Sequence, residues 1–178
     1  ERAAQLASGK TPWTRATGLV VRGYVSRLDD SVQPYGLVIP QSVSTDPWRK
    51  RRLDVWLHGR DNKLSELKFI QQRRTSAGQF TPPDTIVLHP YGRFCNAFKF
   101  AGEADVLEAL AHAKKQYPVD NNRVSIRGFS MGGGGCWHLG AHFAGDWVAV
   151  APGAGFAESL EYLGLARKNA MPPAHEQA

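Results

Sequence analysis

Short hydrophobic runs alternate along this chain with longer segments in which apolar residues recur every three or four positions. The runs are rich in Val, Ile, Leu and aromatic residues and are bounded by Gly, Pro, Asp or Ser, which is typical of β-strands. The first two runs are joined by the turn-like segment 29–31, so we expect them to form an antiparallel pair. The predicted strands cover residues 17–26, 35–40, 53–58, 85–89, 123–129 and 147–151.

Three segments between the later strands have the spacing of amphipathic helices. The clearest covers 103–117, where acidic residues open the helix, lysines close it and a proline follows. The other two cover 64–77 and 131–143. We interpret Asp105 and Glu108 on the first helix as solvated or capping charges. Strands that alternate with helices in this way predict an α/β fold, with a mostly parallel sheet and helices on both faces.

Composition and charge fit a single globular domain. The chain has 178 residues, 42% of them hydrophobic, and a formal net charge of +6. The densest basic run, 49–52, directly precedes a hydrophobic strand, so we interpret it as a solvated strand entry and expect no nucleic-acid partner. No apolar stretch approaches the roughly twenty residues that span a bilayer, and no membrane association is expected.

The two cysteines, Cys95 and Cys136, have no metal-ligand spacing. Free thiols and one disulfide bridge both fit their positions. They therefore leave the redox compartment open, and neither cellular location nor oligomeric state follows from the sequence.

A candidate nucleophile, Ser130, lies in the pentapeptide Gly-Phe-Ser-Met-Gly at 128–132. The pentapeptide directly follows a predicted strand and directly precedes a predicted helix, which is the arrangement of a nucleophile elbow. A serine hydroxyl is a weak nucleophile, so it must be held on a tight turn where a base can reach it and a backbone N–H faces the developing oxyanion. Gly128 and Gly132 leave room for such a turn to close.

Ligands of parallel α/β sheets bind beyond the carboxyl ends of the strands. The loops at that edge are predicted to be 58–63, 89–101, 128–132 and 151–158.

In the first of these loops, the backbone N–H of Gly59 or Arg60 is the candidate partner of the Met131 N–H in an oxyanion hole. A simple turn is the alternative reading. In the second loop, Tyr91, Arg93 and Asn96 are candidate substrate contacts, and a structural role in the loop explains them equally well.

The segments 53–60 and 120–133 together resemble the α/β-hydrolase superfamily, and within it the prolyl oligopeptidase-like serine hydrolases and their esterase relatives. The resemblance covers most of residues 17–165, and its most specific part is 117–135. It implies hydrolysis of an ester or peptide bond in a small substrate through an acyl-serine intermediate, without a metal or an organic cofactor.

The same resemblance implies an acid and a histidine that follow the nucleophile on later strands. Glu158, after the sixth predicted strand, is a candidate acid. We expect packing or surface roles for His138 and His142, which lie on the helix after the elbow, and His175 falls in a tail without strand or helix pattern.

We therefore expect residues 1–16 to be a lead-in or linker, 17–168 a partial hydrolase domain and 169–178 a flexible tail. On this reading the chain is truncated at its C-terminal side, lacks its triad acid and base, and is inactive as a fragment of a serine esterase or peptidase. The alternative function is a non-catalytic binding or interaction module that keeps the elbow as structure.

Overall fold

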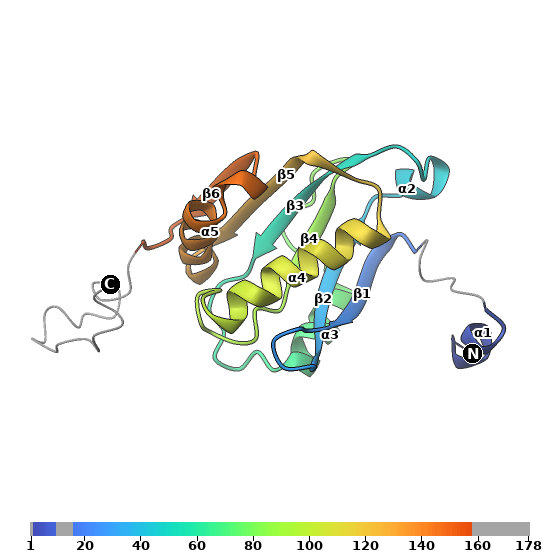
Figure 1. The fold of residues 1–178 in the computed structure, drawn as a ribbon, viewed down its shortest axis with the longest axis horizontal. Helices are drawn as coiled ribbons and strands as arrows, with labels where there is room; N and C mark the ends of the chain where they lie inside the picture. The colour runs from blue at the N-terminus through green and yellow to red at the C-terminus, as the bar shows by residue number, and fades with distance from the viewer. Residues whose placement is uncertain (1, 10–15, 158–178) are drawn as a thin grey trace, which may run out of the picture.

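The computed structural model describes residues 2–9 and 16–157, in which a six-stranded sheet is flanked by helices (Figure 1). The strands are β1 (Gly18–Val25), β2 (Val32–Ile39), β3 (Arg51–Leu57), β4 (Ile86–Pro90), β5 (Val119–Phe129) and β6 (Ala149–Gly153). The helices are α1 (Arg2–Ala7), α2 (Ser42–Thr45), α3 (Glu66–Thr75), α4 (Ala101–Gln116), α5 (Met131–His142) and the 3₁₀ turn η2 (Ala144–Asp146).

The strands lie in the order β1-β2-β4-β3-β5-β6. β2 is antiparallel to both of its neighbours, β1 and β4. β3 is parallel to β4 and β5, and β6 is parallel to β5. The predicted architecture, a mostly parallel sheet with an antiparallel pair at its N-terminal side, is confirmed.

β5 begins at Val119, earlier than the predicted start at 123. The added residues include polar, exposed positions, so hydrophobicity does not mark them as strand. Backbone pairing makes them part of the strand, because Val119 lies opposite Arg51 and the Arg51 N–H donates to Pro118 O over 2.8 Å.

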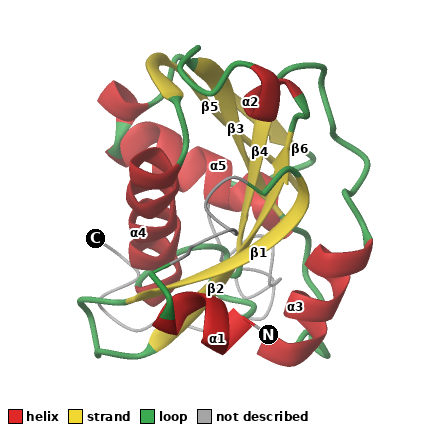
Figure 2. Ribbon diagram, turned by 90° about the vertical axis from the view of Figure 1, so that its right-hand side faces the viewer, coloured by secondary structure: helices red, strands yellow, loops and turns green. Residues whose placement is uncertain are grey.

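The helices lie on both faces of the sheet, as predicted. α3 packs against β1 and β2, whereas α4 packs against β4 and β1, and Figure 2 shows these two helices on opposite sides of the sheet. α5 packs against β3, β5 and β6. Among the described residues, no helix combines the length and hydrophobicity that a bilayer span requires.

The core is centred on the parallel strands. Every residue of β4 is buried, and Leu53, Val55 and Leu57 of β3 have no exposed surface. Strands covered on both faces read as continuous hydrophobic runs. This is why these two strands were predictable from the sequence with nearly their observed bounds.

One basic residue departs from the expected solvated strand entry. Arg51 is 1% exposed, and its guanidinium donates to Ser42 O (2.6 Å) and Asp46 O (3.0 Å) and pairs with Asp84 (3.2 Å). The side chain therefore closes the α2 loop against the start of β3, where it satisfies carbonyl groups that would otherwise be buried without a donor.

Candidate active site

The carboxyl ends of the parallel strands meet at one edge of the sheet. Leu57 of β3 pairs with Gly128 of β5, and Phe129 pairs with Gly153 of β6, so the loops that follow these strands begin at the same level. Ser130, the loop after β3 and the loop after β6 consequently lie side by side.

Ser130 joins β5 to α5 in an unusual backbone conformation. Its φ is 57° and its ψ is −119°, a region that L-residues rarely occupy and that persists only where the surroundings enforce it. The surroundings here are two hydrogen bonds, from Ser130 N to Gly153 O (2.9 Å) and from Gly134 N to Ser130 O (3.0 Å). The serine is partly exposed at the N-terminus of α5, where the free N–H groups and the helix dipole favour negative charge.

Gly128 and Gly132 are required by close backbone approach. A Cβ on Gly128 would lie 2.6 Å from Gly132 O, and a Cβ on Gly132 would lie 2.1 Å from Leu57 O. Both obstacles are main-chain atoms that cannot swing aside. The elbow therefore presses directly against the end of β3, as a strand–turn–helix that presents a serine requires.

Gly59 follows β3 beside the elbow. The position of a Cβ on Gly59 would be 3.7 Å from Phe129 O and 4.0 Å from the Ser130 Cβ. Its backbone thus passes the nucleophile candidate closely, whereas the side chain of Arg60 is exposed and donates to Asn62 over 2.8 Å. The candidate oxyanion donors, at Met131 and at Gly59 or Arg60, are brought to the same side of the sheet.

His58 ties this loop to the next one. Its Nδ1 lies 2.9 Å from Gly59 O and its Nε2 lies 2.9 Å from Tyr91 O, while its ring packs edge-on against Phe98 at 5.1 Å. Because the ring nitrogens face backbone carbonyls, we assign His58 to positioning the Gly59 loop. Its place directly before that glycine was visible in the sequence, but its contact with the loop after β4 was not.

The three candidate substrate contacts after β4 all have partners inside the protein. Arg93 forms a two-point ion pair with Asp29 (2.7 and 3.1 Å). The Asn96 side chain donates to Gly92 O (2.9 Å) and accepts from the Phe98 N–H (2.9 Å). The Tyr91 hydroxyl donates to the carbonyl of the loop after β3 at Leu64 (3.3 Å). These contacts favour a structural role in the loop over substrate contact for all three residues.

The loop that carries them is held in a costly conformation. Positive φ values occur at five of its non-glycine residues, Arg93, Phe94, Ala97, Phe98 and Phe100. Such residues cluster where a binding surface is built on a rigid scaffold. Phe94 and Phe100 are also among the exposed large hydrophobic residues, so the loop presents apolar surface to solvent.

Asp105 anchors this loop, and the expectation of a solvated or capping charge was wrong. Its carboxylate has no exposed surface and accepts from the Tyr24 hydroxyl (2.5 Å) and the Gly92 N–H (2.6 Å). Burial raises the pKa of the Asp105 carboxyl above its usual range. The sequence held a signal for its burial, because Asp105 falls at helical spacing with the buried residues Gly102 and Ala109. Glu108 likewise accepts from Ser26 and the Arg27 N–H.

No family model matches the chain, and no curated protein matches it. Solved structures do. A thermostable esterase superposes with a TM-score of 0.61 at 24% identity, over 75% of this chain and 40% of that one. The fluorophosphonate-binding serine hydrolase FphF of Staphylococcus aureus, with substrate bound, superposes with a TM-score of 0.63 at 17% sequence identity. That match covers 83% of this chain and 61% of FphF. A ferulic acid esterase superposes with a TM-score of 0.54 at 20% sequence identity, and the match covers 79% of this chain and 61% of the esterase.

The chain has the α/β-hydrolase fold. This conclusion rests on those superpositions together with the mixed sheet and its flanking helices. The chain spans between 40% and 61% of the length of these three structures. At such identities the likeness establishes the fold, and the activity of the whole protein is a matter for proposal.

A serine hydrolase built on this fold needs an acid and a base in addition to its nucleophilic serine. Within the described ranges 2–9 and 16–157, the Ser130 hydroxyl makes no hydrogen bond. Asp146 lies in η2, before β6 and so away from the strand ends that meet at Ser130. Glu158 and His175 fall outside the described residues.

The described histidines other than His58 have different neighbours. His89 is 5% exposed, and burial together with Arg73 lowers its pKa to about 3. His112 Nδ1 lies 2.7 Å from the Tyr35 hydroxyl. His138 and His142 lie along α5, and His138 Nε2 is 2.6 Å from Glu103 Oε2.

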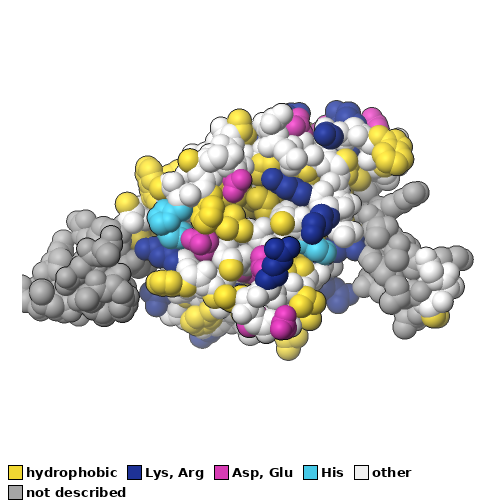
Figure 3. Space-filling view, viewed as in Figure 1, with side chains coloured by type: hydrophobic (Ala, Val, Ile, Leu, Met, Phe, Trp, Pro, Cys, Tyr) yellow, Lys and Arg dark blue, Asp and Glu magenta, His cyan; other side chains and the backbone are white. Residues whose placement is uncertain are grey.

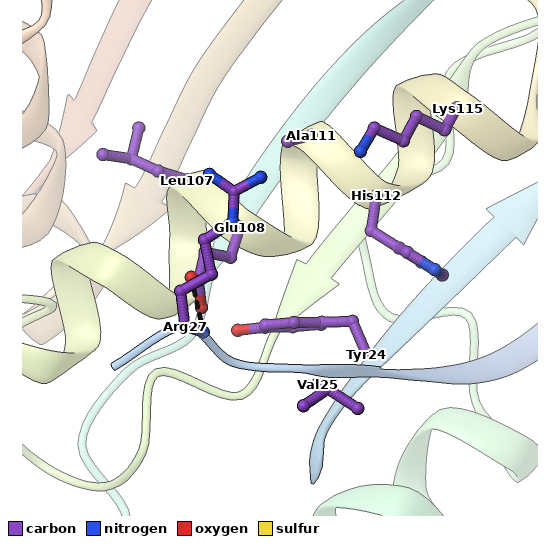
Figure 4. A pocket seen from close by; sticks show the side chains of 8 residues that line it. All are labelled: Tyr24, Val25, Arg27, Leu107, Glu108, Ala111, His112 and Lys115. Carbon is purple, nitrogen blue, oxygen red and sulfur yellow. Dashed lines mark hydrogen bonds between the residues drawn. The ribbon is translucent and has the colours of Figure 1, made fainter. Parts of the chain in front are cut away.

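A separate hollow of about 300 Å³ lies between β1 and α4. Figure 4 shows Tyr24 on the strand below Glu108 and His112 on the helix, with Glu108 bonded to Arg27. None of its lining residues belongs to the elbow or to the Gly59 loop. This hollow is therefore separate from the candidate active site.

Proposed function

We propose that this chain carries the nucleophile and oxyanion-binding part of a serine hydrolase that cleaves carboxylic esters. The observation that supports the proposal best is the backbone of Ser130, which is held at positive φ between β5 and the N-terminus of α5. A protein that used this segment only as a connection would have no need of a strained serine between two glycines that touch neighbouring main chain.

In the proposed reaction the Ser130 oxygen attacks the ester carbonyl carbon while a base takes the hydroxyl proton. The carbonyl oxygen becomes an oxyanion, which accepts hydrogen bonds from the Met131 N–H and from the N–H of Gly59 or Arg60. Each preorganised donor of this kind is worth about 3 kcal/mol of transition-state stabilisation. Collapse of the intermediate releases the alcohol, and water then hydrolyses the acyl-serine.

The proposal assigns the base and the acid to residues outside those described. Three described histidines are excluded by their surroundings, since His58 faces two backbone carbonyls, His89 is buried in β4 and His112 contacts Tyr35. The remaining two, on α5, lie eight and twelve residues past Ser130. At a rise of about 1.5 Å per residue they are roughly 12 and 18 Å along the helix axis.

Ester substrates are supported by the names of two similar structures, a thermostable esterase and a ferulic acid esterase. A putative dipeptidyl aminopeptidase IV from Bacteroides ovatus superposes with a TM-score of 0.54, equal to that of the ferulic acid esterase. A prolyl oligopeptidase-like peptidase remains the second candidate within the same mechanism.

A non-catalytic module is the alternative of another class. It is favoured by one observation, that no described histidine or carboxylate bonds to the Ser130 hydroxyl. The two functions differ in whether that hydroxyl is reactive.

The test is covalent labelling of the full-length protein with a fluorophosphonate probe, followed by peptide mapping and by turnover of short-chain p-nitrophenyl esters. We expect the label on Ser130, and we expect Ser130→Ala to abolish both label and turnover. Ser44→Ala is the matched control, because Ser44 is exposed and, among the described residues, its hydroxyl donates to the nearby Gln41 carbonyl alone. A full-length protein that takes no label, or a Ser130→Ala variant with unchanged turnover, overturns the proposal and favours the binding module.

A further inference from the structure

Two histidines and a glutamate gather where α5 meets the start of α4. His138 and His142 are one helical turn apart on the same face of α5, and their ring centroids lie 4.4 Å from each other. Glu103, in the first turn of α4, approaches His138 with Oε2 2.6 Å from Nε2. One nitrogen or oxygen atom from each of the three residues lies within 4.8 Å of the others.

The cluster is open to solvent on one side. The side chains of His138 and Glu103 are 17% and 30% exposed, and His142 is exposed. Figure 3 shows histidine side chains at the left of this face, over α5, with an acidic side chain next to them. An ion from solution can therefore reach all three residues without opening the core.

Two imidazoles and a carboxylate form a ligand set for zinc and similar transition-metal ions. Zinc binds His nitrogen at about 2.0–2.1 Å and carboxylate oxygen at about 2.0–2.2 Å, and three protein ligands with one water complete a tetrahedron. Calcium and magnesium prefer oxygen ligands, so this set does not suit them. Histidines four residues apart on one helix are a recurrent way to present two such ligands.

Tetrahedral ligands are separated by about 3.3 Å at these bond lengths. The contact between Glu103 and His138, at 2.6 Å, is shorter than that value, and one ligand atom from each of the three residues lies within 4.8 Å of the others. The exposed His142 ring and the partly exposed Glu103 side chain can make the adjustment by rotation of their own torsions.

We propose that Glu103, His138 and His142 bind one divalent transition-metal ion, with zinc as the preferred occupant and water as the fourth ligand. This departs from the expectation of a chain without metal sites. Because the ligands come from two helices, the ion joins the N-terminal turn of α4 to α5, the helix that begins directly after Ser130. The site stabilises that packing and takes no part in acyl transfer, since His138 lies eight residues past the serine.

The experiment titrates zinc chloride into tag-free, chelator-treated protein by calorimetry and follows cobalt(II) by visible absorption. We expect one ion per chain and the intense absorption bands of tetrahedral cobalt. His142→Ala and Glu103→Gln each remove a direct ligand, so they should weaken zinc binding by at least about 100-fold, beyond the effect typical of outer-sphere partners. Glu66→Gln is the matched control, because Glu66 is an exposed glutamate in the first turn of α3 and should leave affinity unchanged.

Thermal unfolding separates loss of the site from loss of the fold. The exposed His142 side chain makes no hydrogen bond with the described residues, and its ring contacts that of His138. The metal-free His142→Ala variant should therefore fold and unfold within a few degrees of the wild-type temperature. Zinc should then raise the unfolding temperature of the wild type and of Ser130→Ala, but not of His142→Ala. Absence of saturable binding, or equal affinity in wild type, His142→Ala and Glu103→Gln, overturns the proposal whatever the reactivity of Ser130.

Discussion

Replacing Gly132 by alanine should force the first turn of α5 away from the end of β3. The added Cβ would lie 2.1 Å from Leu57 O and 2.9 Å from His58 O. Carbon and carbonyl oxygen atoms normally approach to about 3.3 Å, so helix and strand must separate by roughly 1 Å. The obstructing atoms belong to the main chain at the end of a buried strand, and no side-chain rotation relieves the clash.

The loss of folding stability expected for Gly132→Ala is at the upper end of the range for substitutions that overfill a packed interior. Inserting a methyl group into a well-packed interior typically destabilises by about 1–3 kcal/mol. Because Gly132 is closed in by backbone, we expect the free energy of unfolding to fall by about 3 kcal/mol. The same displacement moves the end of β3 relative to the elbow, and so moves the Gly59 backbone that passes the Ser130 Cβ. Fluorophosphonate labelling should fall along with stability.

Guanidinium unfolding followed by circular dichroism measures the effect, with Gly145→Ala as the control. Gly145 has no neighbour within 4 Å of its Cβ position, so its substitution should change stability by less than about 0.5 kcal/mol. If Gly132→Ala is as stable as Gly145→Ala, the close contact between α5 and β3 is wrong, and with it the geometry assigned to the elbow.

Three further predictions concern buried polar groups. Asp105→Ala leaves the Gly92 N–H without its acceptor and leaves the Tyr24 hydroxyl only the backbone carbonyl of residue 105, at 3.2 Å. It should lower the free energy of unfolding by about 1–3 kcal/mol, whereas Asp146→Ala, at an exposed position, should be nearly neutral. Arg51→Met removes the buried guanidinium and its hydrogen bonds, and should lower the free energy of unfolding by about 3–5 kcal/mol. Lys50→Met, at the exposed neighbouring position, should change it little. Equal stability of these two variants would contradict the role assigned to Arg51. Burial and Arg73 lower the pKa of His89 to about 3 in the folded protein, whereas the pKa of this histidine in the unfolded chain is about 6.5. Between these two pH values the unfolded chain binds a proton at His89 that the folded protein does not. The free energy of unfolding therefore falls by up to about 1.4 kcal/mol for each pH unit of acidification in this range. Unfolding curves of His89→Leu measured from pH 7 to about pH 4 should show a shallower decline than wild type, and parallel declines would refute this origin of acid sensitivity.

Local pattern was enough for most of the fold. The core strands β3 and β4 follow from hydrophobic runs, and the 103–117 helix follows from helical spacing and charge placement. The structure confirms the sheet type that their order implies. The polar start of β5 was missed because its strand character comes from pairing with Arg51. The Ser130 elbow was predictable in kind, since its glycines, strand and helix are contiguous in the chain.

Contacts between residues far apart in the sequence could not be predicted from the local pattern. Nothing local distinguishes the exposed Lys50 from the buried Arg51. Helical spacing indicates that Asp105 is buried, but it does not identify Tyr24 as the partner, because the partners of a buried charge come from other elements. In the same way, helical spacing places His138 and His142 on one face, but only the packing of α4 beside α5 brings Glu103 to them. Periodicity along one chain records which side of an element is apolar, whereas a site assembled from several elements exists only after the sheet has brought their ends together.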